Sequence, residues 1–89
     1  MRLRITEGFT EDVIEKVSSE RVLFRIYEAL DRLEAIPELG SSRLPESVAT
    51  RFGSSVRKLV VSPFVVIYEI NEKKGTLDVL ALLHQRQAY

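Results

Sequence analysis

The sequence predicts an α+β fold in which a small antiparallel sheet packs on a pair of helices. One observation is the composition of the last third of the chain, where three short runs are rich in β-branched and other apolar residues: Val56–Val61, Phe64–Ile70 and Leu77–His84. The other is a helical repeat of apolar residues upstream, across residues 20–36. We therefore expect strands over 56–61, 64–70 and 77–83 and helices near 10–18 and 20–36.

The first elements follow from local signals. Arg2–Ile5 alternates polar and apolar residues, which predicts a short edge strand. Thr10 is a good N-cap for the first helix, and Phe9 and Ile14 then occupy the two positions of a hydrophobic staple. The apolar stripe of this helix is expected to consist of Val13, Ile14 and Val17.

The second helix has the clearer pattern. Its apolar residues recur at spacings of three and four, and they are Val22, Leu23, Ile26, Tyr27, Leu30, Leu33 and Ile36. Pro37 ends it. Because only Ser18 and Ser19 separate the two helices, they are expected to form an antiparallel hairpin whose apolar faces turn toward the sheet. The segment 38–45 has the composition of a loop, and 46–53 fits either a loop or a helical turn.

The three apolar runs predict a meander. Ser62-Pro63 separates the first two runs, and Asn71–Gly75 separates the second and third. Both faces of the resulting sheet are largely apolar, whereas a sheet with one solvated face would alternate more cleanly.

The face turned away from the helices is the more informative one. It is expected to carry exposed apolar side chains, namely Val65, Ile67, Leu80 and Leu82. An exposed apolar patch of this kind is typical of a partner-binding surface. The alternative is that the loop 38–53 folds over this face and buries it.

Composition excludes several classes of protein. Eighty-nine residues indicate one domain, 1–89, with a thin core. The absence of cysteine excludes disulfides and thiolate chemistry, and a single histidine argues against a transition-metal site, so no metal or cofactor is expected. No secretory signal and no run of membrane-spanning length is present, which fits a cytoplasmic protein without membrane contact.

The charge is zero overall but unevenly distributed. Residues 1–40 contain six basic and nine acidic side chains, a net of −3, and residues 41–89 contain seven basic and four acidic, a net of +3. Either the split is a solvated surface without a role, or the second half presents a basic end to an anionic partner.

The candidate functional residues lie in this basic half. Arg57 and Lys58 are on the first meander strand, and His84, Arg86 and Tyr89 are at the end of the third. We expect the two groups to meet at one end of the sheet. There the cations would hold a phosphodiester while His84 or Tyr89 moves a proton. The alternatives are a surface histidine, edge charges that deter aggregation, and a frayed C-terminal tyrosine.

The ordered set of segments resembles a known superfamily. After the first strand and the helical hairpin come Ile36–Gly40 (IPELG), then 56–59 (VRKL), 63–68 (PFVVIY) and 82–86 (LLHQR). This set is similar to the RelE/ParE superfamily of toxins from bacterial type II toxin–antitoxin modules, over nearly the whole chain. The resemblance implies a β-α-α-β-β-β fold and growth inhibition that a cognate antitoxin neutralises in a hetero-oligomer, as in plasmid stabilisation modules.

The resemblance leaves two activities open. RelE-like members are ribosome-dependent mRNA endonucleases, and for that branch Lys58, His84, Arg86 and Tyr89 match the catalytic positions. ParE-like members poison DNA gyrase, and Val65, where many RelE-like nucleases carry an arginine, favours this second branch. A degenerate module without toxicity is the third alternative.

The antitoxin contact is expected on the open face of the sheet and the basic end. The expected contact residues are Arg57, Lys58, Val65, Ile67, Leu80, Leu82 and Arg86.

Overall fold

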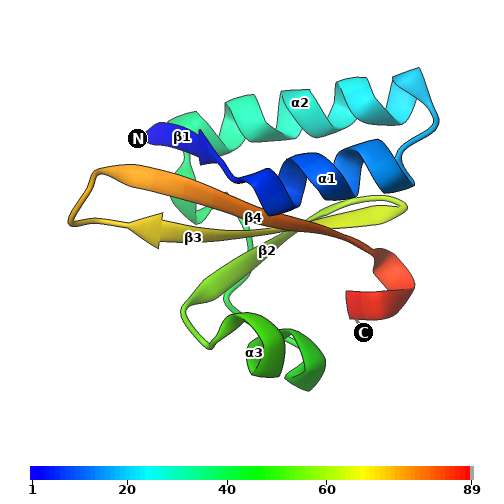
Figure 1. Ribbon diagram of the computed structural model, residues 1–89. Coiled ribbons are helices and arrows are strands. Elements are labelled where there is room, and N and C mark those ends of the chain that lie inside the picture. Colours follow the sequence, from blue (N-terminus) through cyan, green and yellow to red (C-terminus); the bar gives the residue numbers. More distant parts are fainter. Residues whose placement is uncertain (89) are drawn as a thin grey trace.

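The computed structural model describes residues 1–88 and has three layers. A helical hairpin covers one face of a four-stranded sheet, and a short helix with the C-terminal turn covers the other (Figure 1). The elements are β1 (Arg2–Ile5), α1 (Glu7–Lys16), α2 (Glu20–Ala35), η1 (Pro37–Leu39), α3 (Glu46–Phe52), β2 (Val56–Val61), β3 (Phe64–Asn71), β4 (Thr76–His84) and η2 (Gln85–Ala88). The predicted α+β fold class and order of elements are confirmed.

The sheet has the strand order β1-β4-β3-β2. β2, β3 and β4 form the predicted antiparallel meander, and β1 joins β4 in parallel at the opposite edge. The β3–β4 turn ends at Gly75, whose φ of +65° places it in the left-handed region that glycine adopts without strain.

An ion pair fastens β1 to β4. The Arg4 guanidinium lies 2.9 Å from the carboxylate of Asp78, which is only 5% exposed and also accepts a hydrogen bond from the Thr76 hydroxyl. The hydrogen bond from Arg4 holds the pKa of the Asp78 carboxyl below its usual value, although burial acts in the opposite direction.

α1 begins earlier than the sequence predicted. Thr6, not Thr10, is its N-cap, and its Oγ1 accepts a hydrogen bond from the Phe9 amide at 3.3 Å. The same hydroxyl donates to the Val79 carbonyl of β4 at 2.7 Å, so a tertiary contact fixes the helix start. The predicted staple is therefore wrong: Phe9 is a buried helical residue, and Ile14 is 78% exposed.

The apolar face of α2 is largely the predicted one. Ser19 caps the helix, and Ile26, Leu30 and Leu33 are buried against the sheet in the core cluster that includes Tyr68. Tyr27, which the pattern also assigned to this face, is 53% exposed. Both helices of the hairpin thus turn one apolar face to the sheet, as expected.

The second face of the sheet is covered, which contradicts the predicted exposed patch. Val65 and Ile67 have no exposed surface because Val48 of α3 and Ala88 of η2 pack over them. The alternative, in which the segment 38–53 folds over this face, is the correct one (Figure 1).

A β-bulge overturns the predicted facing of β4. Tyr68 pairs with Val79 but Ile67 pairs with Ala81, so Leu80 is an extra residue on β4. Beyond Leu80, each β4 side chain points to the face of the sheet opposite to the one that simple alternation predicts. Leu82 is therefore fully buried in the core under the helical hairpin and does not share a face with Val65.

The loop after α2 is fixed by Tyr68. Its hydroxyl accepts a hydrogen bond from the Gly40 amide at 2.8 Å and donates one to the Pro37 carbonyl at 2.7 Å. Gly40 is required by this close approach, because a Cβ there would lie 2.6 Å from the same hydroxyl and 2.6 Å from the Lys58 carbonyl. The loop is thereby aligned with β2, where Ser41 and Lys58 exchange two backbone hydrogen bonds.

Candidate functional site

The end of β4 forms a corner with the β2–β3 turn. His84 is the last residue of β4 and pairs with Phe64, and their rings meet edge to face with centroids 5.7 Å apart. The chain then turns into η2, where the Gln85 amide donates to the Pro63 carbonyl at 2.8 Å. The polar tail that follows β4 is thus an ordered part of the fold through residue 88.

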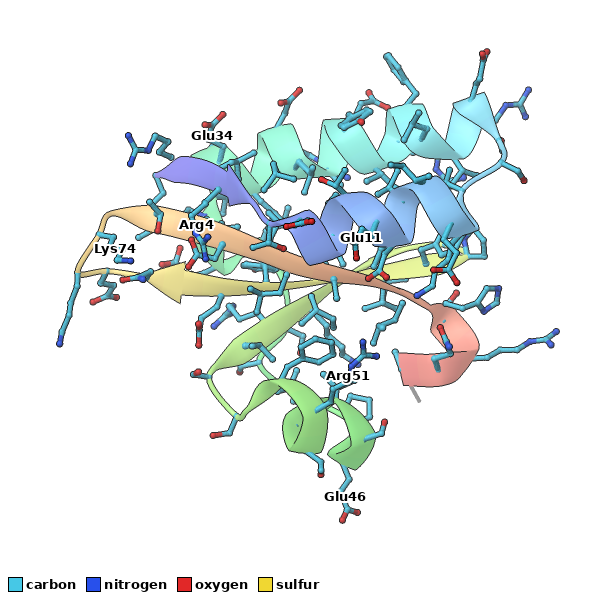
Figure 2. The ribbon with its side chains drawn as sticks, in the orientation of Figure 1. Arg4, Glu11, Glu34, Glu46, Arg51 and Lys74 are labelled. Carbon is cyan, nitrogen blue, oxygen red and sulfur yellow. The ribbon has the colours of Figure 1, made fainter. Side chains whose placement is uncertain are left out.

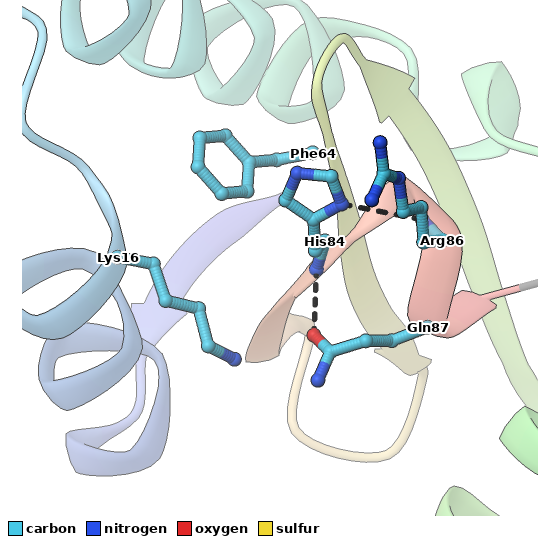
Figure 3. A pocket seen from close by; sticks show the side chains of 5 residues that line it. All are labelled: Lys16, Phe64, His84, Arg86 and Gln87. Carbon is cyan, nitrogen blue, oxygen red and sulfur yellow. Dashed lines mark hydrogen bonds between the residues drawn. The ribbon is translucent and has the colours of Figure 1, made fainter.

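The hydrogen bonds of His84 define its neutral tautomer. The Arg86 amide donates to Nδ1 at 3.3 Å, so the proton of a neutral ring resides on Nε2 (Figure 3). The backbone amide of His84 donates to Oε1 of Gln87 at 3.0 Å. In the described part of the chain the ring is oriented by a backbone amide and not by a carboxylate, unlike the histidine of a catalytic triad.

A pocket opens at this corner. Its volume is about 530 Å³, and it is lined by Lys16, Phe64, His84, Arg86 and Gln87 (Figure 3). Lys16 comes from α1, and its ammonium donates to the Leu82 carbonyl at 2.9 Å and lies 3.6 Å from the Asp12 carboxylate. Sequence reasoning missed Lys16, because the first helix approaches the end of β4 only through the tertiary fold.

Lys16 and Asp12 also protect the edge of the sheet. Beyond the reach of β1, the Leu82 amide donates to Asp12 Oδ2 at 2.9 Å, and its carbonyl accepts from Lys16. The two side chains thus take the place of a neighbouring strand along this part of β4.

Arg57 and Lys58 do not reach this corner. His84 lies level with Phe64 and Val61, at the end of β2, whereas Arg57 is four residues earlier on that strand, roughly 13 Å away along it. β2 and β4 both pair antiparallel with β3, so their last residues lie at the same end of the sheet. Arg57 and Lys58 are instead near the start of β2. The expectation that Arg57 and Lys58 meet His84 and Arg86 at one end of the sheet is therefore wrong.

Arg57 has a structural environment of its own. Its guanidinium donates to the Gly40 carbonyl at 2.9 Å and to the Glu38 carbonyl at 3.3 Å. Lys58 is the next residue along β2, so its side chain emerges on the opposite face of the sheet. Arg86 is exposed at the corner, and Tyr89 lies outside the described residues.

The helical hairpin carries exposed apolar side chains. Ile14 and Tyr27 are 78% and 53% exposed beside a groove of about 270 Å³ between α1, α2 and β1. The periodicity of the helices did not reveal it, because both residues also fit an inward-facing stripe.

The part of the chain that the structure describes contains no cluster of three side chains suited to a metal ion. None of its helices has the length and apolarity needed to cross a membrane.

Comparison with known proteins agrees with this architecture. Residues 3–89 match the family described as the ParE toxin of the type II toxin–antitoxin system, parDE. A chain in the crystal structure of the RelBE2 toxin–antitoxin complex from Mycobacterium tuberculosis has the same fold, with a TM-score of 0.72. The two sequences are 19% identical, and the match covers 93% of this chain and 95% of that one. No curated protein sequence matches. The chain belongs to the ParE toxin family of type II toxin–antitoxin systems.

Proposed function

We propose that this toxin poisons DNA gyrase through protein contact, does not cleave mRNA, and is held inactive by a cognate antitoxin. The family match supports the ParE-like activity over the RelE-like one. The proposal of an antitoxin partner is supported by the structurally similar chain, which was crystallised in a toxin–antitoxin complex.

One observation carries the choice of activity, namely the separation of Arg57 and Lys58 from His84, which the nuclease hypothesis placed together around one phosphate. Cleavage of a phosphodiester requires a proton carrier and cations around one phosphate. Here the Arg57 guanidinium is bound to the carbonyls of Glu38 and Gly40, roughly 13 Å along the sheet from the level of His84.

Val65 adds a second argument. In the RelE-like nucleases that this chain resembles, many members carry an arginine at this place on the middle strand. Val65 is apolar and fully buried beneath α3, so its side chain does not contact a phosphate. Binding without catalysis is the activity that this arrangement supports best.

The test compares two assays on the wild-type chain and on His84→Ala and Arg86→Ala. Gyrase supercoiling with detection of trapped DNA breaks is expected to show inhibition by the wild type. Cleavage of mRNA on translating ribosomes is expected to be absent. Lys74→Ala, at the opposite end of the sheet (Figure 2), is the matched control for loss of one positive charge.

Two results would contradict the proposal. Ribosome-dependent cleavage by the wild type, lost in His84→Ala and Arg86→Ala by about 10²-fold or more, would establish the nuclease activity. Inactivity in both assays, with normal growth during expression, would establish a degenerate module.

A further inference from the structure

We infer that the pocket of Lys16, His84, Arg86 and Gln87 binds a carboxylate side chain of a protein partner. This inference rests on the proposed function, because a toxin that acts by protein contact needs a surface that recognises a partner. Lys16 and Gln87 become recognition residues of the corner, a role that sequence reasoning assigned to neither.

The polar groups at the pocket have free donors. The Nδ1 atom of His84 is occupied by the Arg86 amide, so Nε2–H is the polar atom that remains. The Oε1 atom of Gln87 is likewise occupied by the His84 amide, which leaves its NH₂ group to donate. The remaining donors on these two side chains favour a ligand that accepts hydrogen bonds.

The charges at the pocket favour a single anion. The Lys16 ammonium has three N–H groups, of which the Leu82 carbonyl accepts one and Asp12 lies near a second. Because Asp12 offsets the charge of Lys16, the exposed Arg86 gives the pocket a net charge of about +1. One carboxylate matches that charge, and a bidentate contact with Arg86 matches its geometry.

The surroundings favour a protein ligand over a nucleic acid. Nucleic acids are bound by extended basic surfaces that contact several phosphates. α1, which supplies Lys16, exposes Glu7, Glu11 and Glu15, so the positive charge at the pocket is local and does not extend into a basic surface. The Phe64 ring, which lies against His84, provides an apolar contact for the stem of an acidic side chain or for an apolar neighbour.

The experiment is an NMR titration of the isotopically labelled full chain. The probe is the capped peptide acetyl-Leu-Asp-Leu-amide, and its matched control is acetyl-Leu-Asn-Leu-amide. The acidic peptide is expected to shift the resonances of Lys16, His84, Arg86 and Gln87, and the amide peptide is not. Long-range ¹H–¹⁵N correlations are expected to show the neutral His84 ring with its proton on Nε2.

Variants test the individual donors. Lys16→Met and Arg86→Gln are each expected to weaken binding of the acidic peptide about three- to ten-fold, a modest factor because the pocket is open to solvent. Lys74→Met removes the same charge from the far end of the sheet and is expected to change nothing (Figure 2). Arg86→Gln keeps the inference testable if Lys16→Met is unstable, since the Arg86 side chain is exposed.

Three results would overturn the inference. They are equal shifts with both peptides, a neutral ring protonated on Nδ1, and tighter binding of a ten-nucleotide oligouridine at the same residues. Separate samples with gyrase and with the antitoxin identify which protein supplies the carboxylate. If neither protein shifts the resonances of the pocket residues, the assignment of a protein partner is rejected. The peptide titration needs neither gyrase nor ribosomes, so its failure is distinguishable from a failure of the proposed function.

Discussion

Tyr68→Phe removes one oxygen atom and should cost this small protein a large share of its stability. Tyr68 is fully buried, and its hydroxyl is the hydrogen-bond partner of both the Gly40 amide and the Pro37 carbonyl. Phenylalanine fills the same space but leaves both backbone groups without that partner. Loss of a partner by a buried polar group costs roughly 1–3 kcal/mol, so we expect a loss of about 2 kcal/mol in the free energy of unfolding.

The assay is urea denaturation followed by circular dichroism, with thermal melting as a second measurement. A loss of about 2 kcal/mol corresponds to a fall in Tm of roughly 8–16 °C for a chain of this size. Tyr27→Phe is the matched control, because Tyr27 is 53% exposed on the helical hairpin, and we expect it to change stability by less than about 0.5 kcal/mol. Equal, small losses in both variants would refute the role given to the Tyr68 hydroxyl.

Two further predictions concern the core and the β1–β4 ion pair. Leu30→Ala empties a site in the core beneath the helical hairpin and should lower the free energy of unfolding by about 2–5 kcal/mol; a Tm within a degree or two of the wild type would show that the site is not in the core. Asp78→Asn should remove a pH-dependent contribution to stability. Because Arg4 lowers the pKa of Asp78 in the folded state, that contribution is present above the unfolded pKa of about 4 and is lost as the pH falls through the lower folded value. Urea midpoints from pH 7 to pH 3 should show the wild type losing its advantage over Asp78→Asn at the acidic end, and parallel curves would contradict the assignment.

The parts of the fold that the sequence predicted well are those with local causes. The meander was readable because Ser62-Pro63 and Asn71–Gly75 interrupt runs of β-branched residues, and both turns occur where they were expected. α2 was readable because its apolar period is sustained over four turns and Pro37 ends it. These signals lie within a few residues of the structures that they specify.

The start of α1 shows where local reasoning fails. Thr6 and Thr10 are both acceptable N-caps by residue type. Thr6 is the cap because its hydroxyl also bonds to Val79, a residue more than seventy positions away in the sequence. The choice is made by the tertiary structure, and no window of the sequence contains both partners.

The bulge at Leu80 and the helix α3 limited the prediction of the site most strongly. A single extra residue in β4 reverses the facing of every later residue, so Leu82 enters the core beneath the helical hairpin. α3 is seven residues long and has no side-chain hydrogen bond at its cap. A helix this short is stabilised mainly by tertiary packing, here by burial of Val48 against the sheet.

These two features change where a partner must bind. With Val65, Ile67 and Leu82 buried, the open sheet face that predicted an antitoxin contact does not exist on the folded chain. What projects from the sheet instead is the C-terminal end of β4, where the strand passes beyond β1 and its edge is covered by Asp12 and Lys16. Any change in the position of α1 therefore moves Lys16 relative to His84. The groove and the corner pocket thus share α1, which supplies Ile14 to the one and Lys16 to the other.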